Sequence, residues 1–217
     1  MSFQNIIDTA SSLAVNKNSL VSQTIARDQT VRSVDRGGAV YRFVVEPNPG
    51  MRWSEWRAIV AEIEAKGKLS VETINLSKAA FNYISGYTGA LTAPQLAALQ
   101  LRYTVAGSAV NTKQFELSGL PSVSADTVIF NAGDLIQPQG TNFPYTVTQT
   151  VLRGSNATVA VPVHRTIRQT PSDTYYSVLT GQQVTWRVVC TQLPQWKIIP
   201  YDRIEWSGNF EFYESLL

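Results

Sequence analysis

Apolar residues recur with a helical period along one long stretch of the chain, residues 51–67. Trp53, Trp56, Val60 and Ile63 fall on one stripe, while charged residues occupy most of the other positions. A stripe of this kind predicts an amphipathic helix that packs one face against a core. The glycine at the end of the stretch is a typical C-terminal cap.

Two shorter segments also carry helix signals. Apolar residues near helical spacing predict a helix within residues 3–15. Thr92, with Gln95 three positions later, has the sequence of a capping box and predicts a helix start. The aromatic segment 80–89 lies between them, and its glycines favour a loop.

Most of the remaining chain has strand patterns. Short strands recur between residues 105 and 168 with Gly and Pro between them, which is typical of a small barrel or sandwich. Within this part, residues 145–154 are expected to form one alternating strand that ends at Gly154. The strands after residue 174 are longer and more aromatic, and resemble those before residue 100.

The sequence therefore predicts a β-rich α+β protein with an inserted β unit. The α+β domain is built from the N- and C-terminal parts of the chain, residues 38–104 and 169–217, and the insert spans 105–168. Such insertions are tolerated where the two ends of a loop lie close together. Residues 1–37 are expected to form an N-terminal helix followed by an extended arm.

Composition indicates a surface that is partly covered by partners. The chain has 217 residues, of which 44% are hydrophobic and 16% charged, against about 25% charged in an average soluble domain. Its 5 Trp, 9 Tyr and 8 Phe point the same way, because aromatic residues are enriched at interfaces. A monomer with a large core would have a similar composition.

The charge pattern disfavours packaging of nucleic acid. The net charge is +2, and the nearest approach to a basic run is the scattered set Arg27, Arg32 and Arg36. An arm that binds nucleic acid has to neutralise several phosphates together. The first residues lack the basic and apolar regions of a signal peptide, and no apolar stretch is long enough to span a membrane. We expect a soluble protein made in a cytoplasm, with no membrane partner.

Candidate chemistry is sparse. His164 and Cys190 are the only residues of their types, so a zinc site of three or four N/S ligands is excluded. A lone histidine on a strand edge is usually structural, and Cys190 alternates with Val188 toward a predicted core. Glu62 and Glu64 are two apart on the predicted helix and face different directions, which excludes a paired acid and base. We expect no enzyme activity, catalytic residue, metal or cofactor.

Three acidic residues stand near turn signals. Asp134, Asp173 and Asp202 each follow turn-forming residues. Asp is favoured in turns and caps because its side chain accepts hydrogen bonds from nearby backbone N–H groups. Turn or cap duty is the prediction for all three.

Three C-terminal aromatic residues are candidate interface positions: Trp196, Tyr201 and Trp206. Exposed Trp and Tyr stack on sugar rings, so a carbohydrate site is one interpretation. Packing in a core or between subunits is the favoured one, because large aromatic residues dominate both.

Two segments resemble a recurrent part of tailed-bacteriophage tail and baseplate proteins. In that family, an AGD-x-(I/L)-Q corner precedes a Y-x-V-T strand and a T-x-x-(V/I)-P-(V/L) strand that a basic residue follows. The corner is matched by Ala132, Gly133, Asp134, Ile136 and Gln137, and the strands by Tyr145, Val147, Thr148, Thr158, Val161, Pro162 and Arg165. The strand, turn and helix of residues 42–68 and the ending NFEFYESLL are also similar to that family.

The resemblance implies that the insert is a small split β-barrel in a non-enzymatic virion protein. It implies a tail or baseplate ring or wedge subunit, made in the host cytoplasm and localised in the virion. Its partners are then copies of itself and other tail proteins, with no nucleic acid. Ring subunits bind head to tail, and residues 16–36, which lack an obvious partner within the chain, are hypothesised to reach onto a neighbouring copy.

Two alternatives remain open at this point. Size and β content also suit an icosahedral virus coat protein, although the basic arm is missing. A carbohydrate- or receptor-binding module is the other alternative. Under all three interpretations, Gly133 and Asp134 form a tight corner of the inserted unit, because glycine adopts backbone conformations that other residues resist.

Overall fold

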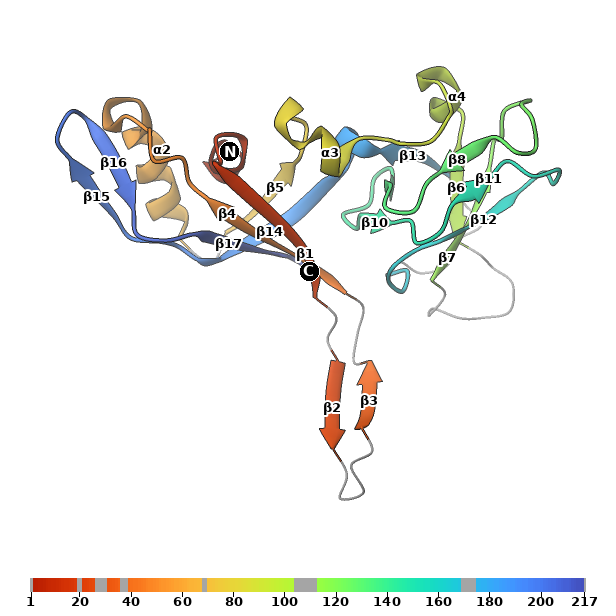
Figure 1. The fold of residues 1–217 in the computed structure, drawn as a ribbon, viewed down its shortest axis with the longest axis horizontal. Helices are drawn as coiled ribbons and strands as arrows, with labels where there is room; N and C mark the ends of the chain where they lie inside the picture. Colours follow the sequence, from red (N-terminus) through yellow and green to blue (C-terminus); the bar gives the residue numbers. More distant parts are fainter. Residues whose placement is uncertain are drawn as a thin grey trace. The chain divides into compact units, whose positions relative to one another are not determined.

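The protein is described by a computed structural model that covers residues 2–18, 21–25, 31–35, 39–67, 70–103, 113–168 and 175–216. The chain forms two compact units (Figure 1). Unit 1 combines Met1–Asn75 with Trp186–Leu217, and unit 2 is Leu76–Thr185. The fold is α+β and rich in strands, as the sequence predicts.

Unit 1 is built on a five-stranded sheet with the order β1-β4-β17-β14-β5. The helices α1 (Ser2–Asp8) and α2 (Trp53–Lys66) lie over one face of this sheet (Figure 1). Two separate hairpins complete the unit, β2–β3 and β15–β16. The strands are β1 (Ser12–Asn18), β2 (Val21–Ile25), β3 (Val31–Asp35), β4 (Val40–Glu46), β5 (Val71–Asn75), β14 (Thr185–Gln192), β15 (Trp196–Ile199), β16 (Arg203–Trp206) and β17 (Phe210–Glu214).

Strand register brings large apolar side chains together on the covered face. Phe212 of β17 lies opposite Phe43 of β4 and Cys190 of β14, and all three are buried. Directly opposed residues of antiparallel strands point to the same face. Trp186 packs edge-on against the Phe43 ring at 5.5 Å between centroids. The core of unit 1 is therefore aromatic, and the prediction that Cys190 is buried is confirmed.

Helix α2 confirms the strongest sequence prediction. Trp56, Val60 and Ile63 are its buried residues, and Gly67 caps its C-terminus by donating its N–H to the carbonyl of Ile63. Burial of side chains of this size contributes about 1.5–3 kcal/mol each to folding. The helix is thus fixed on the sheet by its predicted stripe.

The N-terminal predictions require correction. The helix ends at Asp8, and Ser12–Asn18 forms strand β1, which pairs with β4 from Ser12↔Glu46 to Asn18↔Val40. Half-buried Leu13 and Val15 alternate with exposed neighbours there, and this period of two outweighs the weak helical spacing. Within 16–36, the described residues pair inside the chain: β2 pairs with β3 from Val21↔Asp35 to Ile25↔Val31. Residues 16–18 also pair with β4, so the segment does have a partner in the chain, and its contact with a neighbouring copy stays a prediction.

Unit 2 contains a six-stranded sheet with the order β10-β9-β13-β6-β7-β12 and a two-stranded sheet β11-β8. Short helical segments precede the first strand and follow β13. The elements are η1 (Ala79–Phe81), α3 (Asn82–Ser85), α4 (Ala93–Ala97), β6 (Gln100–Tyr103), β7 (Gln114–Ser118), β8 (Val128–Phe130), β9 (Leu135–Pro138), β10 (Tyr145–Thr146), β11 (Val151–Leu152), β12 (Val159–Pro162), β13 (Tyr176–Thr180) and η2 (Gly181–Gln183).

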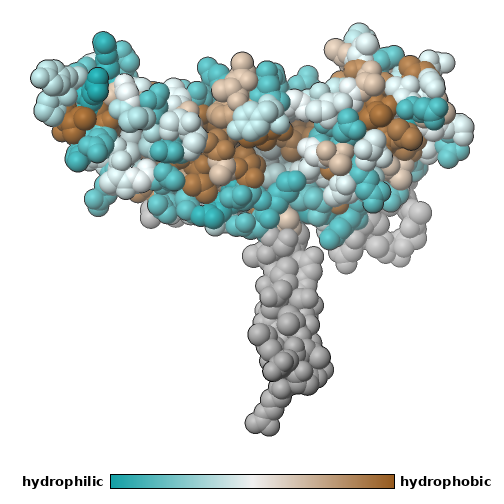
Figure 2. Space-filling view, viewed as in Figure 1, coloured by the Kyte–Doolittle hydropathy of each residue, from teal (hydrophilic) through white to brown (hydrophobic). Residues whose placement is uncertain are grey.

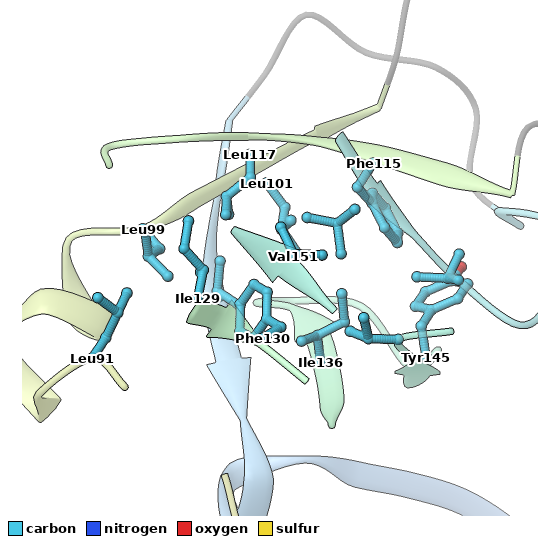
Figure 3. Packing of buried hydrophobic residues seen from close by; sticks show 14 of the residues in the cluster. Leu91, Leu99, Leu101, Phe115, Leu117, Ile129, Phe130, Ile136, Tyr145 and Val151 are labelled. Carbon is cyan, nitrogen blue, oxygen red and sulfur yellow. The ribbon is translucent and has the colours of Figure 1, made fainter. Parts of the chain in front are cut away.

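The two edge strands of the six-stranded sheet meet. Val147, just after β10, forms an antiparallel bridge with Val163, just after β12. The N–H of Thr148 donates to the carbonyl of Pro162, and the N–H of His164 donates to the carbonyl of Thr146, each at 3.0 Å. All six strands of this sheet contribute side chains to one buried cluster, and Figure 3 shows how these side chains pack together.

The boundaries of the second unit differ from the predicted insert, 105–168. Strands β6 and β13, which the sequence predicts as parts of the terminal domain, belong to the six-stranded sheet. They pair through Tyr176↔Leu101 and Ser177↔Gln100, and β13 also pairs with β9. Their aromatic composition suited either unit, so the pairing could not be decided from pattern alone.

Two local predictions in this unit also change, and one is confirmed. Residues 145–154 do not form one strand: Tyr145, Thr146 and Val147 are all buried and the chain then leaves the sheet before β11. The segment 80–89 contains a 3₁₀ turn and helix α3 instead of a loop. The capping box at α4 is present, with the N–H of Thr92 donating to Oε1 of Gln95 at 2.9 Å.

Candidate functional site

The Asp134 carboxylate is the centre of a corner that joins two loops of unit 2. Oδ2 accepts the N–H of Asn131 at 2.9 Å, and Oδ1 accepts both the N–H and the hydroxyl of Thr88, at 3.1 and 2.6 Å. The side chain of Asn131 completes the link by donating to the carbonyl of Thr88 at 2.8 Å. A buried carboxylate whose oxygens accept three hydrogen bonds holds loops together.

The neighbouring corner residues are also held by structure. Gly133 has a φ of 103° and donates its N–H to the carbonyl of Val147, whose own N–H donates to the carbonyl of Asp134. Ile136 is fully buried in the cluster of unit 2. Gln137 is also fully buried: its amide donates to the carbonyl of Thr141 and accepts the N–H of Thr185. All four predicted corner residues therefore make backbone or core contacts.

The remaining candidates for chemistry lie in separate places. Nδ1 of His164 accepts the N–H of Thr146 at 3.0 Å, beside the joined edge strands. Cys190 is fully buried in the sheet of unit 1. Asp173 lies outside the described residues. Within the described ranges, no group of three or more His, Cys, Asp or Glu residues could hold a metal ion.

The three aromatic candidates of the C-terminal part lie on one hairpin. Trp196 of β15 and Trp206 of β16 are directly opposite each other, and Tyr201 is in the loop between the strands. The sequence predicts a strand around Trp196 but does not identify β16. Trp196 stacks on Trp53 of α2 with 4.8 Å between ring centroids, so the hairpin packs against that helix.

A surface hollow of about 420 Å³ lies between this hairpin and α2. Nε1 of Trp196 donates to Oε1 of Glu64 at 2.9 Å, which places a carboxylate at the hollow. Trp206 also lines two neighbouring hollows. We call the largest of these "the hollow"; its residues are Val60, Ile63, Glu64, Leu193, Pro194, Gln195, Trp196 and Trp206.

At the other end of the hairpin the chain makes a strained turn. Tyr201 and Asp202 have φ values of 69° and 60°, a region that residues other than glycine rarely adopt. Tyr201 is 93% exposed. In the surface view, hydrophobic side chains interrupt the hydrophilic surface of β15–β16 (Figure 2).

Asp202 fixes this turn to the start of α2. Its carboxylate accepts the N–H of Ser54 at 3.0 Å and the hydroxyl of Ser54 at 2.5 Å, and its carbonyl accepts the N–H of Trp53. The Ser54 hydroxyl, then the Ser54 N–H and the charge of Arg52, lower the pKa of Asp202, against the opposing effect of desolvation. The predicted cap duty of Asp202 is confirmed.

Two arginines flank the turn. Arg52 and Arg203 form an isolated antiparallel bridge, so their side chains leave the backbone on the same face. Both are exposed, and within the described part of the chain neither guanidinium is within 4.0 Å of a carboxylate oxygen. We call Arg52, Tyr201 and Arg203 "the tip".

No protein-family model matches the chain, and no curated protein matches it in sequence. Among the described helices, none is long and apolar enough to cross a membrane.

Proposed function

We propose that this chain is a non-enzymatic structural subunit of a tailed-bacteriophage virion, a tail or baseplate ring or wedge protein. In this proposal it is made in the host cytoplasm and assembles with copies of itself and with other tail proteins. It binds neither nucleic acid nor membrane. The six-stranded sheet of unit 2 is then the small split β-barrel that the resemblance implies.

The observation that carries the proposal is that the residues which resemble the phage family lie together where the edge strands β10 and β12 meet. Gly133 and Asp134 exchange backbone hydrogen bonds with Val147, and Val147 bridges to Val163 where the edge strands meet. Arg165 is fully buried, lies over the ring of Tyr145 at 5.1 Å and donates to the carbonyl of Pro144. The three segments that resemble the family in sequence thus contact one another at the joined edge strands. This arrangement supports a fold shared with that family.

The surroundings of the chemical candidates support a structural role. The oxygens of Asp134 are occupied by backbone and hydroxyl donors, and the Cys190 thiol is buried. A nucleophile or general base needs an accessible reacting atom and a partner in hydrogen-bond reach. Neither residue has this arrangement.

Electron microscopy of the purified full chain tests the proposal. A ring or wedge subunit is expected to form closed rings or arcs of defined curvature at micromolar concentration. Closed shells would instead favour the coat-protein alternative. A protein that stays monomeric at every concentration, alone and with tail proteins of its own particle, would contradict the proposal.

A carbohydrate- or receptor-binding module is the second candidate, and the hollow is the observation that favours it. Trp196 and Trp206 line the hollow together with the carboxylate of Glu64 and the amide of Gln195, a combination that suits a sugar. Binding to a glycan array that is lost in Trp206→Ala, with the fold retained by circular dichroism, would support this second candidate.

A further inference from the structure

Several hydrogen bonds to residues 51–54 hold the strained turn of the β15–β16 hairpin in place. Left-handed backbone at a residue other than glycine is energetically unfavourable and persists only where the surroundings enforce it. Here the carbonyl and carboxylate of Asp202 hold Trp53 and Ser54, and the N–H of Ile204 donates to the carbonyl of Met51 at 3.1 Å. The result is a rigid turn that presents Tyr201 to solvent.

Repulsion between the two arginines beside Tyr201 also disfavours this arrangement of the turn. Like charges that lie directly opposite each other on paired strands destabilise the pair, and Arg52 faces Arg203 in this way. The Asp202 carboxylate, on which Arg52 acts, offsets part of this repulsion, and a second carboxylate from outside the turn would offset more of it. The tip therefore has the features of a preorganised anchor for an aromatic-lined, acidic site. Tyr and Arg are among the residue types that are enriched in interface hot spots.

The hollow has the complementary chemistry. Its lining is apolar apart from Glu64 and Gln195. Glu64 is exposed, and one of its oxygens accepts the Trp196 N–H, which leaves the second oxygen for an incoming guanidinium or hydroxyl. Apolar walls with a few placed polar groups are typical of sites that receive an aromatic side chain.

The tip cannot reach the hollow of its own chain. The hollow includes the pair Trp196↔Trp206 at one end of the hairpin, whereas the turn follows the pair Ile199↔Arg203 at the other. The two pairs are three residue steps apart along the strands, about 10 Å, and Tyr201 is 93% exposed. An occupant from the tip has to come from another copy.

We propose that Tyr201 of one copy docks in the hollow of a second copy, with Arg52 and Arg203 facing Glu64. This inference rests on the proposed function, since it names the head-to-tail contact through which the subunits assemble. The contact joins two different surfaces, so each copy has one tip and one hollow in use. Repetition of such a contact generates a ring when the rotation closes.

Complementation between two variants of the full chain tests the contact. Tyr201→Asn removes the anchor and suits the backbone, because Asn is enriched at positive φ. Glu64→Arg gives the hollow the charge of the tip. Each variant alone is expected to self-associate about 30-fold or more weakly, the loss typical of an interface hot spot. An equimolar mixture is expected to form dimers, because one intact tip meets one intact hollow.

Sedimentation velocity on the single variants and the mixture gives the readout, with thermal unfolding to verify folding. Tyr83→Asn removes an exposed tyrosine of unit 2, 77% exposed, and Asp126→Arg reverses an exposed charge there. Both controls are expected to associate like the wild type.

Three results would overturn the inference, and they differ in what they say about assembly. Wild-type oligomers that persist in both variants would refute the tip-and-hollow contact but leave the structural role intact. Weakened variants whose mixture stays monomeric would do the same. A wild-type chain that never self-associates would refute the contact and count against the structural role, and glycan binding lost in Glu64→Arg would then assign the hollow to a sugar.

Discussion

Asp202 caps helix α2 from the far side of the sequence: its carboxylate accepts the N–H and the hydroxyl of Ser54, 148 residues earlier. The residue before the helix, Arg52, provides no side-chain cap. The first N–H groups of a helix need acceptors, and the hairpin loop supplies them here. This link makes the β15–β16 hairpin and α2 one body, on which the tip and the hollow are both carried.

Removal of the Asp202 carboxylate is expected to loosen the hairpin. Asp202→Ala leaves the Ser54 N–H without its acceptor and places alanine at a φ of 60°, so we expect the melting temperature to fall by at least about 2–4 °C, the shift typical of losing one helix cap in a protein of this size. Asp202→Ser retains a capping oxygen and is expected to lose less. Equal melting temperatures for wild type and Asp202→Ala, by differential scanning calorimetry, would show that the cap is not stabilising.

The same cap predicts a dependence on pH. The folded-state pKa of Asp202 is lowered, chiefly by the Ser54 hydroxyl. The carboxylate therefore contributes stability above the unfolded-state pKa of about 3.9, and this contribution is lost as the pH falls through the lower folded-state pKa. The difference in melting temperature between wild type and Asp202→Asn is expected to be constant from pH 5 to 7 and to shrink below pH 4. A difference that grows in acid would contradict the cap.

Asp134 is expected to matter for stability alone. Asp134→Asn replaces one accepting oxygen by an NH₂ group that meets an N–H or hydroxyl donor, which costs about 1–3 kcal/mol of unfolding free energy. Urea denaturation measures this loss. The matched control is Asp126→Asn, an exposed carboxylate of the same unit, which is expected to stay within about 0.5 kcal/mol of wild type. Equal losses of unfolding free energy in the two variants would show that the Asp134 carboxylate does not stabilise the corner.

Alanine substitutions at two glycines distinguish the cost of a strained backbone from the cost of a steric clash. A Cβ at Gly133, with φ 103°, would meet no atom within 4 Å, whereas a Cβ at Gly119, with φ 71°, would lie 2.2 Å from the carbonyl oxygen of Ala98. Gly133→Ala is therefore expected to cost about 1–3 kcal/mol for the conformation alone. Gly119→Ala adds a steric clash, and urea denaturation is expected to rank it as the more damaging. A larger loss of unfolding free energy in Gly133→Ala than in Gly119→Ala would mean that other atoms crowd the corner at Gly133.

The sequence was sufficient where the signal was local and strong. The stripe of α2, its glycine cap and the Thr92–Gln95 capping box could all be predicted, because each depends on residues a few positions apart. The burial of Cys190 followed from alternation along a single strand.

Features that depend on distant partners were not predictable. The local pattern predicts a helix for part of β1, because the pairing of β1 with β4 is not visible in that pattern. The sequence does not identify β16, since Arg203–Trp206 is a strand of four residues that is defined by its register with β15. The site followed the same rule: Trp196, Tyr201 and Trp206 were singled out as aromatic residues, but the hollow and the strained turn arise from α2, which is far away in sequence.

The central claim is that the chain is a structural part of a phage tail, and immunogold electron microscopy of purified tailed particles tests it most directly. With an antibody raised against this chain, we expect gold at one fixed position on the tail or baseplate of each particle. Intact particles without label, while the chain is recovered free from the same lysate, would contradict the claim.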